Sequence, residues 1–111
     1  MALIRRYERF DVYWVNLDPS IGSEISKTRP CIIVSPEFMN NILNTVLIVP
    51  LTRTLIDWPF RMPITVKNEN GSIACDHLRS ISKVRLGTKI GVISTAEQEH
   101  ILNILQDIFT L

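Results

Sequence analysis

The chain has 111 residues, of which 46% are hydrophobic, and a formal net charge of +1; this predicts one folded domain over residues 1–111 rather than a disordered chain. Its longest uninterrupted apolar stretch, residues 46–49, is far shorter than the ~20 residues of a membrane helix, and no apolar segment follows the N-terminal arginines, so we expect a cytoplasmic protein with no membrane contact. A net charge this small argues against a protein that permanently coats duplex DNA.

The first predicted element is a strand over residues 10–17, FDVYWVNL. It is rich in β-branched and aromatic residues and apolar on both alternating faces, as in a strand enclosed in a barrel or sandwich. The following segment, DPSIGSEISKTRP at 18–30, begins with Asp-Pro, contains glycine and is predicted as a loop. This loop carries one carboxylate, Glu24, and two cations, Lys27 and Arg29.

Three further strands follow in chain order. Residues 31–36, CIIVSP, and 44–52, NTVLIVPLT, have the composition of strands, and a polar and aromatic connection runs from 52 to 60. Residues 60–68, FRMPITVKN, alternate between apolar and polar side chains. Because Pro63 cannot donate to a strand ladder, this strand is expected at a sheet edge or at a bulge.

The rest of the chain predicts a hairpin, a short strand and a helix. Asn70-Gly71 is a tight-turn signal that joins strand 60–68 to a strand over 72–81, and 89–94 forms a last short strand. A helix follows, capped by Ser94 with Glu97 or by Thr95 with Gln98. Its apolar side chains recur at helical spacing, at Ile101, Ile104, Leu105, Ile108 and Phe109. Five or six strands and one C-terminal helix predict a mostly β fold with minor α, a small antiparallel barrel.

Neither cysteine suggests a metal or redox site. Cys31 and Cys75 both lie inside apolar segments, and neither has a second thiol or a histidine at metal-ligand spacing. We therefore expect buried free thiols, no bound metal and no cofactor. The sequence also lacks a glycine-rich phosphate loop and a serine nucleophile elbow.

The charge is distributed unevenly. Residues 51–91 contain seven Lys and Arg against three Asp and Glu, a local charge of +4, whereas residues 92–111 contain three Glu and Asp and no Lys or Arg, a local charge of −3. A basic region on a nearly neutral body suits an anionic ligand that is bound locally and released. Charge alone leaves ordinary solvated surface as an equal alternative.

Four side chains have the chemistry for cleaving RNA without a metal, which needs a base for the 2′-OH, cationic donors for the phosphorane and an acid for the leaving oxygen. Glu24, shielded in a loop closed over substrate, could act as the base. Arg29 offers a planar fork that matches phosphate oxygens, and Thr52 could add a hydroxyl donor. His77, beside Asp76, carries an imidazole within a predicted strand.

Each of these residues also has a structural interpretation. Glu24 could form a surface pair with Lys27, and Arg29 could brace its loop. Thr52 could simply end a strand, and His77 could be a satisfied sheet residue. Residue types alone leave both interpretations open.

The segment FDVYWVNLDPSIGSEISKTRPCIIVSPEFMN resembles the start of the MazF/PemK family of toxin endoribonucleases. That family has an aspartate-led strand, a D-P-x-x-G-S-E loop, an R-P pair and an apolar strand ending in S-P. The family's later P-L-T, P-F and D-Q-[IV]-[RK]-[ST] segments recur at 50–52, 59–60 and 76–80, and the resemblance runs from about residue 10 to the C-terminus. The matching positions in the first segment are Asp11, Trp14, Asp18, Pro19, Gly22, Ser23, Glu24, Arg29, Pro30, Ser35 and Pro36.

The resemblance implies a CcdB-like barrel that forms a homodimer and cleaves single-stranded RNA at specific sequences. It implies an mRNA interferase of a type II toxin–antitoxin system that needs no metal and leaves a 2′,3′-cyclic phosphate and a 5′-hydroxyl. The family's catalytic arginine and threonine fall on Arg29 and Thr52, and its assisting glutamate falls on Glu24. The expected partner is a cognate antitoxin whose acidic, flexible tail covers the RNA groove.

The resemblance also implies the residues that hold RNA. Asp76, His77 and Arg85 would contact bases or phosphates. Loops 18–28 and 53–58, with Ser23, Lys27 and Arg53, would read splayed bases, and Trp58 or Phe60 would stack on them.

Two features depart from the family pattern. Position 77 is usually glutamine, whose amide offers a donor and an acceptor together, whereas the neutral imidazole of His77 must adopt one tautomer; the RNA sequence preferred by this chain can therefore differ. The N-terminal extension, residues 1–8, carries Arg5 and Arg6, which either contact RNA or belong to a solvated tail.

Two other function classes compete with the ribonuclease. A CcdB-like toxin has a similar barrel and poisons gyrase by binding, and a catalytically inactive SH3-like barrel would bind RNA and leave it uncut. A pure binder has no need of Glu24, Arg29 and Thr52 together, so this set favours the ribonuclease.

Overall fold

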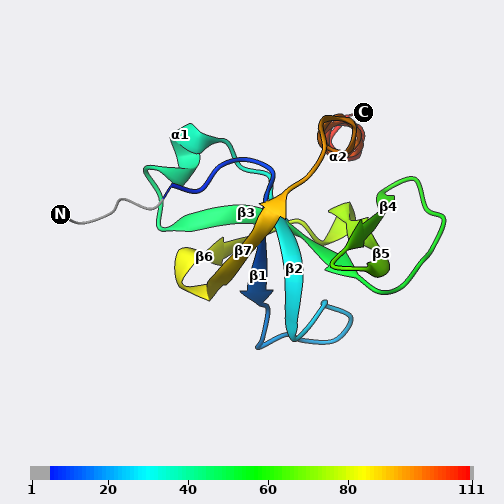
Figure 1. The fold of residues 1–111 in the computed structure, drawn as a ribbon, viewed down its shortest axis with the longest axis horizontal. Helices are drawn as coiled ribbons and strands as arrows, with labels where there is room; N and C mark the ends of the chain where they lie inside the picture. The colour runs from blue at the N-terminus through cyan, green and yellow to red at the C-terminus, as the bar shows by residue number, and fades with distance from the viewer. Residues whose placement is uncertain (1–5, 111) are drawn as a thin grey trace.

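The computed structural model describes residues 6–110, which form a curled antiparallel sheet with one long helix (Figure 1). The prediction of a mostly β fold with a C-terminal helix is confirmed. The elements are β1 Asp11–Asn16, β2 Thr28–Ile33, α1 Glu37–Asn40, β3 Thr45–Thr52, β4 Arg61–Val66, β5 Glu69–Ala74, the 3-10 turn η1 Cys75–His77, β6 Arg79–Ser82, the 3-10 turn η2 Lys83–Arg85, β7 Leu86–Val92 and α2 Thr95–Ile108.

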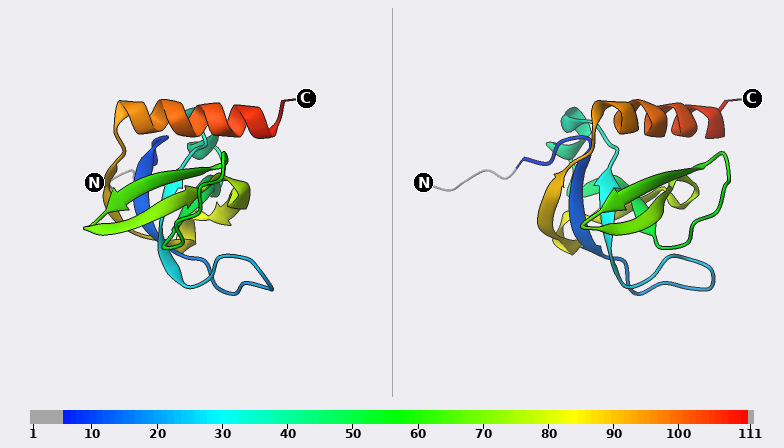
Figure 2. Two further views of the ribbon diagram at one scale, coloured as in Figure 1. Left: turned by 90° about the vertical axis from the view of Figure 1, so that its right-hand side faces the viewer. Right: turned by 45° about the vertical axis from the view of Figure 1, so that its right-hand side comes forward.

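The strands form a half-barrel in the order β4-β5-β3-β2-β1-β7, with β6 paired to the first part of β3. Helix α2 lies along one side of this curled sheet (Figure 2). Strand β4 is at one end of the order and pairs with β5, which confirms the edge position predicted from Pro63.

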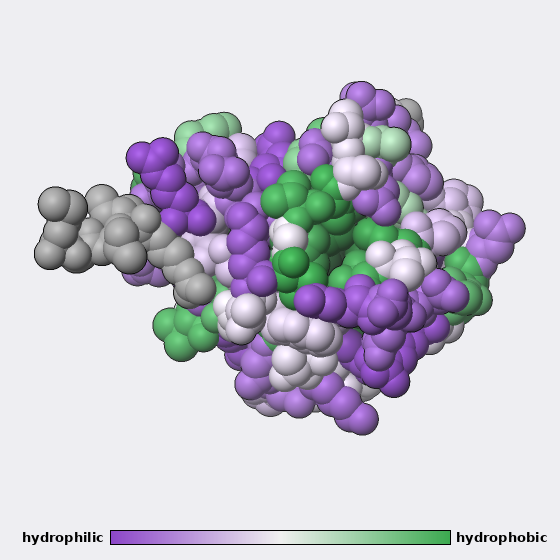
Figure 3. Space-filling model, in the orientation of Figure 1, coloured by the Kyte–Doolittle hydropathy of each residue, from purple (hydrophilic) through white to green (hydrophobic). Residues whose placement is uncertain are grey.

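The core is divided between the two faces of the sheet. On the first strand, Val12 belongs to one buried cluster, which includes Ile101 and Ile104 of α2, while Tyr13 and Val15 belong to the other. This confirms that β1 is enclosed on both faces, as its apolar composition predicted. On the face shown in Figure 3, apolar side chains line a hollow beneath α2, with polar side chains around it.

The β4–β5 hairpin exists, but its predicted turn is wrong. Val66 pairs with Glu69, so the loop is Lys67-Asn68, whose φ angles are 52° and 64°, as in the primed turns that suit tight hairpins. Gly71 instead lies inside β5, where an added Cβ would stand 2.4 Å from the backbone oxygen of Thr52. The glycine is needed because β5 crosses β3 closely at this point.

Other elements also differ from the sequence prediction, among them the last strand, which runs over Leu86–Val92 rather than 89–94. Strand β2 begins at Thr28, inside the predicted loop, and Pro30 pairs with Trp14. The predicted strand 72–81 is divided by η1, so the sheet has seven strands. The short helix α1 was not predicted, because four residues are too few for a periodic pattern.

Helix α2 begins as predicted. Ser94 Oγ accepts a hydrogen bond from Glu97 N, and Glu97 Oε1 accepts one from Ser94 N at 2.9 Å, which completes the capping box. The apolar stripe is buried at Ile101 and Ile104. The prediction of a buried stripe is wrong for its last two positions, because Ile108 and Phe109 are exposed.

Both cysteines are free and buried, as predicted. Burial raises the pKa of the Cys31 thiol. Burial, followed by the charge of Asp76, raises the pKa of Cys75 to about 12. Within residues 6–110, no helix is long and apolar enough to span a membrane.

Candidate active site

A cleft of about 200 Å³ lies where the β1–β2 loop meets η1 and the start of β6. It brings together a carboxylate, an imidazole and a guanidinium from three separate segments. The loop contributes Glu24, η1 contributes His77 and β6 contributes Arg79. The apolar part of the lining consists of Leu17, Ile25, Pro50 and Leu78.

Arg79 is a site residue that the sequence analysis missed. Its only signal was its place in the D-x-x-R-S segment at 76–80. In the fold, its Nη1 donates to the backbone oxygen of Leu17 at 3.4 Å, so it links β6 to the end of β1 beside the cleft. A partly buried guanidinium that lines an open cleft can bind a phosphate oxygen.

The β1–β2 loop is closed at its base by backbone and side-chain hydrogen bonds. Leu17 N donates to Lys27 O at 2.9 Å, and Lys27 N donates to Asp18 Oδ1 at 3.0 Å. Arg85 Nη1 donates to the backbone oxygens of Asn16, at 3.1 Å, and of Asp18, at 2.5 Å. Arg85 therefore holds the loop in place beside the cleft.

Glu24 is exposed and belongs to the cleft, and its own loop orients it. Its Oε1 accepts a hydrogen bond from Ile21 N at 2.9 Å, and its backbone N–H donates to Ile21 O. Ser23 and Lys27 on the same loop are exposed. Among the ion pairs within residues 6–110, none joins Glu24 to Lys27, so the alternative of a surface pair finds no support.

Arg29 and Thr52 lie at the ends of adjacent strands. Cys31 pairs with Pro50 at the last pair between β2 and β3; Arg29 lies two residues before Cys31 on β2, and Thr52 lies two residues after Pro50 on β3, where β3 pairs with β5. Arg29 is half-buried, and its Nε donates to Ser26 O at 3.3 Å. Pro50 lines the cleft and Thr52 is two residues further along β3, which places the pair next to the cleft rather than in its lining.

A second group of polar side chains leads from the β3–β4 connection to the cleft. Arg61 binds Asp76 through two hydrogen bonds of 2.7 and 3.0 Å, and Asp76 Oδ2 lies 3.6 Å from His77 Nε2. Partial burial alone would raise the pKa of Asp76, but the hydrogen bond and charge of Arg61 outweigh it and hold that pKa below its usual value. His77 belongs to η1, so its predicted place within a strand is wrong.

The two aromatic candidates for base stacking differ in exposure. Trp58 is 43% exposed, and its ring lies 5.3 Å from that of Phe60 and 5.2 Å from the guanidinium carbon of Arg61. Phe60 is partly buried and packs on the core. Trp58 is therefore the more accessible surface. On β5, Glu69 forms an exposed ion pair of 3.1 Å with Arg53, another predicted RNA contact.

The predicted site residues thus fall into three places. Glu24 and His77 share the cleft, with Arg29 and Thr52 beside it and Arg85 under its loop. Asp76 borders the cleft through His77, whereas Arg53 and Phe60 lie toward the β4–β5 hairpin. The described residues contain no group of three or more His, Cys, Asp or Glu side chains placed to hold a metal ion.

Comparison with known proteins relates this chain to bacterial toxins. Residues 8–109 match the family model described as PemK-like, MazF-like toxin of type II toxin-antitoxin system. The chain is 32% identical over 98 residues to the endoribonuclease toxin MazF of Escherichia coli K12, covering 86% of this chain and 88% of that protein. It is 30% identical over 118 residues to the endoribonuclease PemK of Escherichia coli, covering 97% and 88%.

Solved structures support the same fold. MazF from Deinococcus radiodurans superposes with a TM-score of 0.85 at 19% identity, over 97% of this chain and 100% of that one. A mycobacterial endoribonuclease solved in complex with its cognate antitoxin superposes with a TM-score of 0.77 at 24% identity, over 91% and 92%.

Proposed function

The chain belongs to the PemK-like, MazF-like family of type II toxin–antitoxin toxins, and from this premise we propose that it is a cytoplasmic endoribonuclease that cuts single-stranded RNA at a short sequence without a metal. The observation that carries the proposal is the cleft that gathers Glu24, His77 and Arg79 beside the strand ends of Arg29 and Thr52. The names of the relatives, endoribonuclease MazF and endoribonuclease PemK, support the same reaction class.

The proposed reaction is an in-line attack of the ribose 2′-oxygen on the adjacent phosphorus. Glu24 takes the 2′-OH proton, and the guanidinium of Arg29 binds the oxygens that gain charge in the phosphorane. Thr52 donates its hydroxyl to the same phosphate. The products are a 2′,3′-cyclic phosphate and a free 5′-hydroxyl.

Sequence preference comes from the two loops that flank the cleft. Ser23 and Lys27 on the β1–β2 loop, and Arg53 on the β3–β4 connection, are exposed and can meet splayed bases. Trp58, with Phe60 beneath it, offers a stacking surface. Asp76, His77 and Arg85 are also proposed to contact RNA. They lie in or beside the cleft, between the two loops.

The reaction is tested by incubating the purified protein with a long single-stranded RNA in EDTA and sequencing the cut ends. We expect repeated cuts at one short motif, with 5′-hydroxyl ends that polynucleotide kinase labels without prior phosphatase treatment. RNA left intact by the wild-type protein would reject the ribonuclease. The next measurements would then be gyrase inhibition and RNA binding, the activities of the two competing classes.

We also propose two partners. The first is a cognate antitoxin with an acidic flexible tail, attracted by the local charge of +4 over residues 51–91. A mycobacterial relative of the same fold has been solved with its antitoxin. An acidic peptide from the cognate antitoxin should compete with RNA, and failure to compete would argue against a shared groove.

The second partner is another copy of this chain. Large apolar side chains are exposed at Phe38, Ile42 and Val84, by 71%, 80% and 92%, and a symmetric interface would bury surface of this kind. Light scattering should give a molar mass twice the chain's 12.7 kDa. A mass of one chain at micromolar concentration would reject the homodimer.

A further inference from the structure

We propose that His77 is the general acid that protonates the 5′-oxygen as it leaves, and that Asp76 and Arg61 position it. This inference rests on the proposed ribonuclease and adds the proton donor that the reaction needs. The resemblance places an RNA-holding glutamine at this position, and an amide has no proton to give at neutral pH, whereas an imidazolium does.

The location of His77 fits a proton donor. It lines the same cleft as Glu24, but comes from η1 rather than from the β1–β2 loop. An in-line displacement needs a base at the attacking oxygen and an acid at the leaving oxygen, and two titratable groups contributed by different segments of one cleft can serve the two oxygens. His77 is 25% exposed, so it is held by the protein and can still reach bound RNA.

A chain of contacts leads from Trp58 to the imidazole. Asp76 Oδ2 lies 3.6 Å from His77 Nε2, so Nδ1 is the ring nitrogen assigned to the substrate. Asp76 is itself fixed by the two hydrogen bonds from Arg61, whose side chain is 9% exposed. Arg61 in turn lies against the ring of Trp58. The imidazole therefore faces a carboxylate that two hydrogen bonds hold in place.

The charged groups around His77 come from four segments. Asp76 lies on the same turn and Glu24 on the β1–β2 loop, while Arg79 belongs to β6 and Arg61 to β4. Two carboxylates and two guanidiniums therefore surround the imidazole.

The proposed step balances. Glu24 accepts the 2′-OH proton as the 2′-oxygen forms its bond to phosphorus. The bond from phosphorus to the 5′-oxygen breaks, and that oxygen takes the proton from His77. Glu24 is then protonated and His77 neutral, and exchange with water restores both, with no other reactant.

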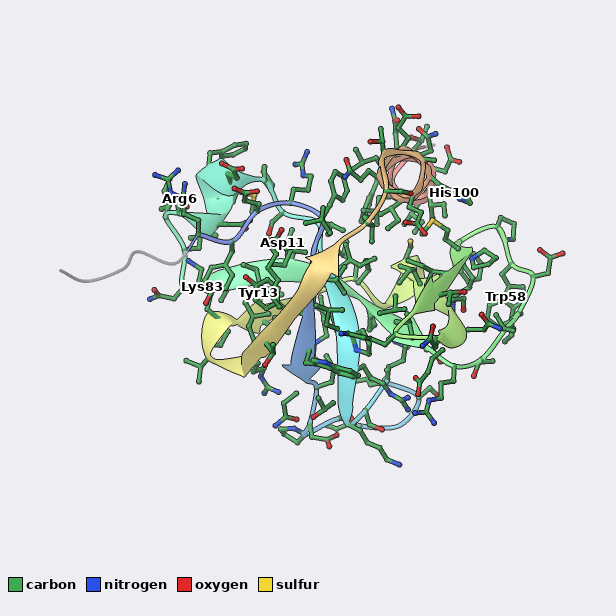
Figure 4. The ribbon with its side chains drawn as sticks, in the orientation of Figure 1. Arg6, Asp11, Tyr13, Trp58, Lys83 and His100 are labelled. Carbon is green, nitrogen blue, oxygen red and sulfur yellow. The ribbon has the colours of Figure 1, made fainter. Side chains whose placement is uncertain are left out.

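The test uses two RNA substrates that differ at one atom. In the second substrate, sulfur replaces the bridging 5′-oxygen at the mapped cleavage site, and a thiolate leaves without being protonated. His77→Gln should slow cleavage of ordinary RNA by about 10²- to 10⁴-fold and cleavage of the sulfur substrate by less than about 10-fold. The matched control is His100→Gln, which changes an exposed histidine on α2 (Figure 4) and should behave as wild type on both substrates.

Other outcomes overturn the proposal. Equal slowing of both substrates by His77→Gln would mean that His77 only binds RNA, and an unchanged rate on ordinary RNA would mean that it has no role. If the wild-type protein cuts neither substrate, the ribonuclease itself is rejected and the acid with it. Matching thermal melts for wild type and His77→Gln exclude misfolding as the cause of a loss.

A second variant tests the positioning residue. Asp76→Asn removes the carboxylate charge that faces His77 Nε2. Cleavage of ordinary RNA should slow through kcat while KM stays near the wild-type value, and cleavage of the sulfur substrate should change little. Equal slowing of both substrates would contradict the positioning role.

Discussion

Two polar networks, one beside α1 (Figure 1) and one beside Trp58 (Figure 4), differ in their access to water. At the α1 end, Asn40 is 1% exposed; its Oδ1 accepts a hydrogen bond from Ser35 Oγ, and its Nδ2 donates to the backbone oxygens of Tyr7 and Ser35, both at 3.0 Å. Beside Trp58, Arg61 binds Asp76, whose side chain is 32% exposed, and Asp76 faces His77.

The difference in burial suggests a different role for each network, one in stability and the other in activity. The buried amide ties residues before β1 to α1 and the sheet, and each of its groups would be costly to leave unpaired. In the Arg61–Asp76 pair, Arg61 is 9% exposed and Asp76 is 32% exposed. Water on the Asp76 side weakens the pair, and that same exposure lets a substrate reach the histidine beside it. Changes at the α1 end should lower stability, and changes around the cleft should lower activity.

A large effect on activity is expected beside the cleft, at Arg29. Arg29→Ala removes the cation assigned to the phosphorane, and we expect RNA cleavage to fall by about 10³-fold with an unchanged thermal midpoint. Initial rates on the mapped RNA motif measure the loss. A variant that cleaves at the wild-type rate would remove Arg29 from the reaction.

The largest expected effect on stability lies in the buried network. Asn40→Ala leaves Ser35 Oγ and two backbone oxygens without the amide, and we expect a loss of about 2–3 kcal/mol in the free energy of unfolding. Urea titration measures it, with the exposed neighbour Asn41→Ala as the matched control. Cleavage per folded molecule should not change. A large fall in activity without a loss of stability would contradict the assignment of this network to stability alone.

A smaller effect on activity is expected at the base. Glu24→Gln keeps the size of the side chain and an oxygen that can accept the hydrogen bond from Ile21 N, but it cannot take the 2′-OH proton. Cleavage should fall by about 10²-fold. Unaltered binding of an uncleavable 2′-deoxy substrate would show that the loss is chemical, and weaker binding would assign Glu24 to RNA contact.

The smallest expected effect is the change in the free energy of unfolding caused by Asp76→Asn. Its pKa is lowered in the folded protein, so the unfolded chain binds more protons and stability rises with pH through the carboxyl range. At pH 7, Asp76→Asn should cost no more than about 1 kcal/mol, since the pair is partly exposed. The cost should vanish as pH falls through the folded pKa, and urea titrations from pH 7 downward through the acid range would show it. A cost that stays constant over the whole of that range would mean that the loss does not come from the ion pair.

The sequence by itself determined the features that depend on neighbours along the chain. A strand apolar on both faces, the edge position of Pro63 and the Ser94–Glu97 cap follow from alternation, a missing donor and a three-residue spacing. The resemblance added the family, through a loop and strand pattern that needs no tertiary contact to be recognised.

Only the tertiary structure decided the features that depend on distant partners. A glycine is required at position 71 because the backbone oxygen of Thr52 leaves no room for a Cβ, and not because of a turn. Asp76 is held by Arg61 of β4. Arg79 joined the site because β6 pairs with β3 and so lies beside the cleft. Local preference cannot contain these contacts, because each joins groups far apart in the chain whose approach is fixed by how the sheet curls.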